Sequence, residues 1–110
     1  MPLILGQSDT LWYPVKGSMV AEDGARAPYE FQIQIPRMSR EEISTMALIG
    51  TDAQIVTEKL KDWKGIVDAD GKDVPFSPAN VAAVIAICPV AADIVAAIYE
   101  AHSPEGRRKN

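Results

Sequence analysis

Apolar and polar residues alternate through the first third of the chain. From Leu11 the pattern is strand-like, because Tyr13, Val15, Gly17, Met19 and Ala21 alternate with more polar neighbours. The alternation is cleanest at Tyr29, Phe31, Ile33 and Ile35. A period of two places such a set on one face of a strand. The intervening Glu22-Asp23-Gly24 is typical of a turn, because glycine tolerates positive φ. We therefore expect an antiparallel hairpin over residues 12–35 with one wet face, its second strand bracketed by Pro28 and Pro36.

Helical patterns follow the hairpin. Ser39 and Glu42 have the spacing of a capping box, and the same spacing recurs at Thr51 and Gln54. Two helices are therefore predicted, the first ended by Gly50 and the second by Gly65. The apolar residues of the second helix recur at spacings of three and four, so they share one face of a helix that is predicted to extend as far as Trp63. These residues are Ala53, Val56, Leu60 and Trp63.

The second half of the chain predicts a loop and two more helices. Residues 65–76 are expected to form a tight loop or short hairpin, and Ser77-Pro78 is a strong helix start. Pro89 interrupts the apolar stripe that follows and can begin the last helix. That last helix is apolar nearly all round, which in a small domain indicates a subunit or partner interface. We take four of its residues as the candidate partner surface, with a place in the core as the alternative: Ile94, Val95, Ile98 and Tyr99.

These patterns predict an α+β fold in one domain: an N-terminal antiparallel β-hairpin or small sheet followed by about four α-helices. The length of 110 residues suits one domain over residues 1–110. Residues 1–10 and 103–110 are expected to be flexible.

Composition narrows the function. Hydrophobic residues make up 47% and charged residues 24%, which is typical of a folded globular protein. The net charge of −4 argues against a nucleic-acid partner, because phosphate binding needs a basic face. The basic cluster at 107–109 fits a solvated terminus. The apolar stretch 81–99 contains Pro89 and Asp93, so we expect two short buried helices and no membrane span.

Candidate chemistry is sparse. His102 has no nucleophile at a recognisable spacing, and the single cysteine, Cys88, is expected to be a small buried hydrophobe. Asp68 and Asp70 match the first two ligand positions of a calcium loop, but Lys72 falls where the third ligand belongs. No phosphate-binding, dinucleotide or zinc motif is present. We therefore expect a protein that is not an enzyme and has no cofactor or metal.

One segment resembles a known family. Residues 63–77 read WKGIVDADGKDVPFS, with Trp63 at the end of a predicted helix and Ser77 at the start of the next. This stretch is similar to the W-x-G-V-x-D-x-x-G-x-x-V-P-F-S segment of the small tail assembly chaperones of long-tailed, siphovirus-type bacteriophages and prophages. The resemblance covers residues 63–100. We expect the motif residues to specify the fold of the loop and its flanks. They are Trp63, Gly65, Asp70, Gly71, Pro75, Phe76 and Ser77.

The resemblance implies a function. Such chaperones act in the cytoplasm of the host bacterium, where they bind the tape measure protein, help to recruit tail tube protein and stay out of the finished particle. The resemblance implies no catalytic residue. Because the last helix is apolar nearly all round, we also expect that the chain can form a homo-oligomer. The alternative is a structural minor tail or head–tail joining protein. The Ala-rich final helices and Cys88-Pro89 depart from the usual pattern of the family.

Overall fold

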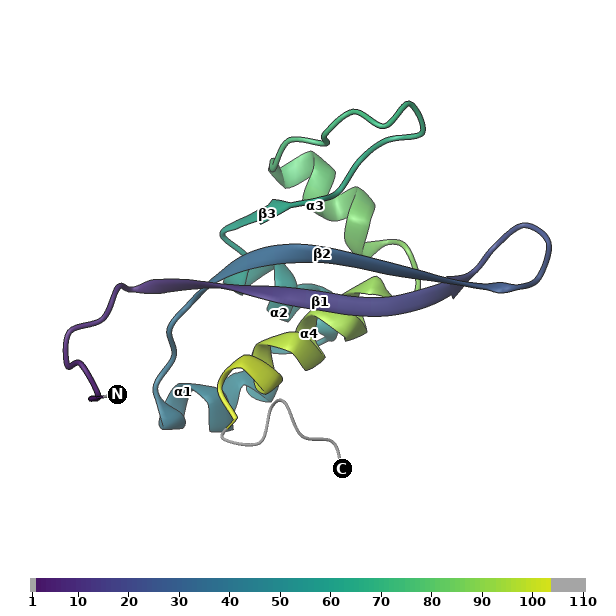
Figure 1. The fold of residues 1–110 in the computed structure, drawn as a ribbon. Helices are drawn as coiled ribbons and strands as arrows, with labels where there is room; N and C mark the ends of the chain where they lie inside the picture. Colours follow the sequence, from purple (N-terminus) through teal and green to yellow (C-terminus); the bar gives the residue numbers. More distant parts are fainter. Residues whose placement is uncertain (1, 104–110) are drawn as a thin grey trace.

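The computed structural model describes residues 2–103 and has an α+β architecture (Figure 1). One antiparallel sheet has the order β1–β2–β3, with β1 at Thr10–Val20, β2 at Arg26–Pro36 and β3 at Asp62–Lys64. The helices are α1 (Arg40–Thr45), the 3-10 helix η1 (Met46–Ile49), α2 (Asp52–Lys59), α3 (Pro78–Ile85) and α4 (Val90–Ala101). The predicted fold class is confirmed. The flexibility and the basic cluster expected near the C-terminus fall on residues 104–110, which lie outside the described residues.

Strands β1 and β2 form the predicted hairpin, whose tip extends beyond the helices (Figure 1). Val15 lies opposite Phe31, and the apolar set of β2 faces the helices as the alternation predicts. Phe31, Ile33 and Ile35 are buried, and Tyr29 is half-buried. The other face of the sheet carries the polar residues of the alternation.

Pro28 lies within β2, which corrects the predicted start of this strand. The Lys61 N–H donates to the Gln34 carbonyl at 2.9 Å, so every second residue of β2 counted from Gln34 directs its backbone groups toward β3. Pro28 has this parity, but β3 pairs only with residues 32–34. The missing N–H of Pro28 therefore faces an open edge, where it removes no hydrogen bond from the ladder.

Local capping fixes where the helices begin. Ser39, Thr51 and Ser77 each accept a hydrogen bond from the backbone N–H three residues later, at 3.1, 3.3 and 3.1 Å. The first two complete a capping box, and Pro78 follows Ser77 at the first helical position. These three helix starts were predicted and are confirmed.

The second helix is shorter than predicted. α2 ends at Lys59, Leu60 is already extended, and Trp63 lies in β3 opposite Ile33. Trp63 is buried because β3 pairs with β2. The prediction that Trp63 belongs to the apolar stripe of a helix was therefore wrong. The sequence gives no local reason for this, because spacings of three and four residues also occur by chance in a chain that leaves a helix for a strand.

Helix α4 packs along the inner face of the hairpin. Its buried residues belong to the same core as the inner residues of the sheet: Val90, Ile94, Val95, Ala97 and Ile98. Two tyrosines fasten it at either end, since Tyr29 donates a hydrogen bond to Asp93, and Tyr13 donates to Glu100 at 2.9 Å. Gly17 leaves room for Asp93 to approach β1, because a Cβ there would collide with the carboxylate and with the Tyr29 ring.

The junction of α3 and α4 corrects the expectation for Cys88. α3 ends at Ile85, so Cys88 falls in the turn ahead of Pro89 and is exposed. Among residues 2–103 no single helix is long and apolar enough to cross a membrane; α3 and α4 meet those criteria only as a pair, bent by 102° at their junction.

Candidate protein-binding surface

Trp63 anchors the loop that leads from β3 to α3. Its side chain is 6% exposed, and the indole Nε1–H donates to the Val74 carbonyl at 2.7 Å. The Phe76 ring meets it edge-on, with 5.1 Å between ring centroids and an angle of 81°. This is a favourable aromatic geometry, and the indole N–H has the partner that a buried tryptophan needs. The contacts fix the return of the loop toward α3.

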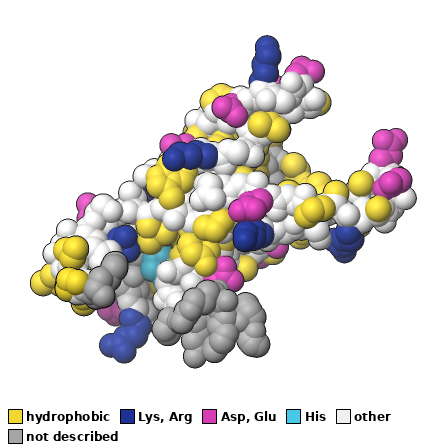
Figure 2. Space-filling model, in the orientation of Figure 1, with side chains coloured by type: hydrophobic (Ala, Val, Ile, Leu, Met, Phe, Trp, Pro, Cys, Tyr) yellow, Lys and Arg dark blue, Asp and Glu magenta, His cyan; other side chains and the backbone are white. Residues whose placement is uncertain are grey.

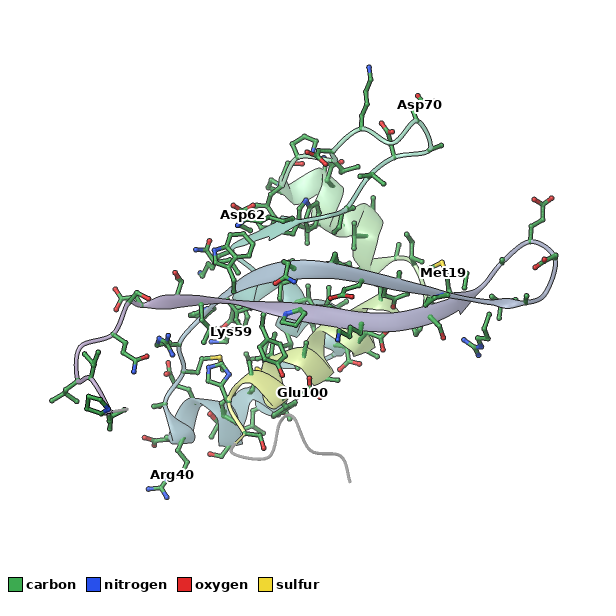
Figure 3. The ribbon with its side chains drawn as sticks, in the orientation of Figure 1. Met19, Arg40, Lys59, Asp62, Asp70 and Glu100 are labelled. Atoms are coloured by element: carbon green, nitrogen blue, oxygen red, sulfur yellow. The ribbon has the colours of Figure 1, made fainter. Side chains whose placement is uncertain are left out.

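The loop is a short hairpin closed by an acidic side chain. Val67 and Asp73 form a single bridge, and the Asp68 carboxylate accepts from the backbone N–H groups of Asp70 and Lys72 at 2.9 and 3.0 Å. Gly71 has a φ of +82°, which suits glycine. Asp70 lies exposed at the outer end of the loop (Figure 3), next to Gly71 in the turn, and the side-chain hydrogen bonds that close the turn come from Asp68.

The other motif residues place the start of α3. The Asn80 side chain donates to the Pro75 carbonyl at 2.8 Å, while its backbone N–H is capped by Ser77. Gly65 has a φ of +88° and lies against Phe31, where an added Cβ would come within 3.5 Å of the strand backbone. Trp63, Phe76 and Gly65 therefore attach the loop to the core, and Ser77 starts α3, whereas Asp70 and Gly71 form the exposed turn.

An apolar groove lies between α2 and α3. Its volume is about 280 Å³. The lining combines residues from both helices with the motif loop: Thr57, Leu60, Phe76, Pro78, Val81 and Ala82. Phe76 is thus shared, with its ring against Trp63 and also in the wall of the groove. The loop motif shapes this groove indirectly, by holding Phe76 and starting α3.

A second, more open hollow continues along α2. It has a volume of about 410 Å³ and shares Thr57 with the apolar groove. Its lining comes from the end of η1 and from α2: Ile49, Ala53, Gln54, Thr57 and Glu58. Ala53 and Thr57 lie one turn apart on α2 and lead to Leu60, while Ile49 comes from the end of η1, which Gly50 and Thr51 separate from α2. We call the two hollows together the α2 groove.

The partner surface expected on α4 is placed differently. Ile94 and Ile98 are completely buried, and Val95 is 8% exposed. The alternative interpretation, a place in the core, describes these three residues, because α4 turns them toward the sheet. Tyr99 is 37% exposed and remains on the surface.

The α2 groove was not predicted as a site. Leu60 and Val81 were recognised as apolar positions, but their helices are separated in sequence by β3 and the loop. Only the folded chain brings Thr57 of α2 beside Ala82 of α3. Ala53 and Thr57 are one turn apart on α2, but one is small and the other polar, so they gave no apolar pattern from which the groove could be predicted.

Two titratable side chains, His102 and Tyr29, hold parts of the fold together. His102, at the end of α4, accepts from the Met38 N–H at 3.0 Å through Nε2, and its Nδ1 lies 2.9 Å from the Ile98 carbonyl. Burial, followed by the hydrogen bond to Asp93, raises the pKa of Tyr29. Within residues 2–103 no group of three or more His, Cys, Asp or Glu side chains is placed to hold a metal ion.

Comparison with known proteins places the chain in a protein family. A family model described as YdaY prophage protein matches residues 20–108, which is most of the chain. No curated protein and no solved structure matches the chain.

Proposed function

This chain belongs to the YdaY prophage protein family, and on that premise we propose that it is a non-enzymatic tail assembly chaperone. It binds the tape measure protein in the cytoplasm of the host bacterium and aids assembly of the tail tube. Prophage origin and the resemblance of residues 63–100 to tail assembly chaperones support this function together.

The observation that carries the proposal is the α2 groove. It offers an apolar hollow of about 280 Å³ that continues into a more open one of about 410 Å³ past Thr57. A peptide helix presents apolar side chains at i, i+3, i+4 and i+7, which is the pattern that such an elongated groove receives. Tape measure proteins consist of long apolar helices, so one of these helices is the proposed occupant.

The charge of the chain fits a holder of apolar helices. The net charge of −4 favours solubility of the chain itself, and Glu58, which lines the more open hollow, has a side chain that is 56% exposed and lies 3.7 Å from the Lys59 ammonium.

The test is co-expression of this chain with the tape measure protein of the same prophage. We expect the chain to keep the tape measure protein soluble and to be captured with it. Ala82→Glu places a carboxylate in the groove, where desolvation disfavours binding, and should abolish capture. Ala83→Glu is the matched control, because Ala83 is also exposed on α3 but does not line the groove.

Purified particles separate the chaperone from the structural alternative. A chaperone is absent from mature particles, whereas a minor tail or head–tail joining protein is present in them. Presence in particles, or equal capture by both variants, contradicts the proposal.

A further inference from the structure

The N-terminal segment of the chain exposes three consecutive large aliphatic residues. Leu3, Ile4 and Leu5 are 86%, 64% and 96% exposed. Figure 2 shows hydrophobic side chains gathered at the end of the molecule where Figure 1 places this segment. A run of exposed aliphatic residues is unfavourable in water unless another surface covers it.

The segment starts from a fixed point on the fold. Arg37 donates to the Ser8 carbonyl through Nε and to the Asp9 carbonyl through its backbone N–H, at 2.9 and 2.8 Å. Gly6, with a φ of +89° and open space around it, turns the chain away from the direction of β1. The aliphatic residues are therefore held off the sheet and lie away from α3 of their own chain (Figure 1).

The chain also carries a surface that matches them. The apolar part of the α2 groove is open, and its lining of Leu60, Phe76 and Val81 with three neighbours is mostly apolar. Its size suits one or two aliphatic side chains, whereas a whole helix needs the α2 groove along its full length. The segment carries no charged side chain between residues 2 and 6, so its entry leaves no buried charge unpaired.

We infer that Leu3–Leu5 of one copy docks in the apolar part of the α2 groove of a second copy. When two copies exchange their segments, one association event covers both exposed runs and both grooves, which is the closed two-fold arrangement most common among homo-oligomers. The docked segment occupies the site proposed for the tape measure helix, so the helix displaces it. The self-association itself does not depend on the tape measure protein.

The experiment is sedimentation of the purified full chain over a concentration series. We expect a dimer whose dissociation constant rises at least about tenfold in Leu5→Ser and, separately, in Ala82→Glu. Matched controls should keep the dimer: Leu48→Ser changes an 83% exposed leucine outside the groove, and Ala83→Glu changes the neighbouring alanine of α3.

Cross-linking in trans identifies the contact. With Cys88→Ser as background, copies carrying Leu5→Cys are mixed with differently tagged copies carrying Ala82→Cys. A disulfide between the two tags is expected, and none when Ala83→Cys replaces Ala82→Cys. A monomer at every concentration, or Leu5→Ser and Ala82→Glu dimers as tight as wild type, overturns the inference. Capture of the tape measure protein by a chain that stays monomeric leaves the proposed function standing and removes only the self-docking.

Discussion

Replacing Trp63 by alanine tests how the loop motif supports the fold. The side chain is 6% exposed, it donates one hydrogen bond and it packs against Phe76. Truncating a buried tryptophan to alanine costs about 3–5 kcal/mol. The Val74 carbonyl also loses its donor, which places the expected cost in the upper part of that range.

The effect is large for a domain of this size, whose whole stability is about 5–15 kcal/mol. At about 4–8 °C per kcal/mol, a cost of about 4–5 kcal/mol for Trp63→Ala should lower the melting temperature by about 16–40 °C. Circular dichroism at 222 nm during urea and thermal unfolding measures both quantities. Trp63→Phe keeps an aromatic ring beside Phe76 but loses the N–H, so it should cost about 1–2 kcal/mol.

The other tryptophan is the control. Trp12 is 37% exposed on the outer face of the sheet, with the Lys64 ammonium 4.1 Å from its ring centroid. Trp12→Ala should therefore cost less than Trp63→Ala, about 1–2 kcal/mol, from the cation–π contact and the partial burial that it loses. A loss below about 1.5 kcal/mol for Trp63→Ala, or equal losses for Trp63→Ala and Trp63→Phe, would refute the assignment of Trp63 as the anchor.

Three further changes probe the fastening of α4 and the first helix start. Gly17→Ala brings a methyl group against Asp93 and Tyr29 and should destabilise the fold by about 1–3 kcal/mol in urea unfolding; an unchanged midpoint contradicts the close packing. Because the pKa of Tyr29 is raised, its hydrogen bond to Asp93 stabilises the fold fully below the ordinary tyrosine pKa of 10.0, and this stabilisation is lost as the pH rises above 10.0. Between pH 9 and pH 11, wild type should therefore lose more stability than Tyr29→Phe, as measured by urea midpoints. The Ser39 backbone N–H lowers the pKa of Glu42, so this cap stabilises the fold above the ordinary value of 4.5 and is lost as pH falls through the lowered value; Glu42→Gln should show a flatter acid profile than wild type, and identical profiles argue against the cap.

Features set by neighbours in sequence were predictable. The caps at Ser39, Thr51 and Ser77 depend on residues three positions apart, and the hairpin depends on a period of two, so both are readable from the chain. The turn at Asp70-Gly71 was likewise predictable from the loop motif, whereas the side-chain hydrogen bonds that Asp68 accepts there were not.

Features set by distant pairing were not predictable. Trp63 belongs to a strand because β2 offers a free edge beside it, and that edge exists only after the hairpin has folded. For a related reason the sequence left open whether the apolar residues of α4 lie on the surface or in the core. An all-round apolar helix does not reveal which face a sheet will cover, and the hairpin covers Ile94 and Ile98. The α2 groove joins two helices across the loop, so sequence alone does not bring its walls together.

The most direct measurement of the central claim is a binding titration between the purified chain and a soluble helical segment of its tape measure protein. We predict saturable binding by wild type and the same affinity for Ala83→Glu. The affinity of Ala82→Glu should be at least about tenfold weaker, since of the two alanines only Ala82 lines the groove. No binding by wild type, or equal affinities for the two variants, would contradict the claim that this prophage protein holds tape measure helices in the α2 groove.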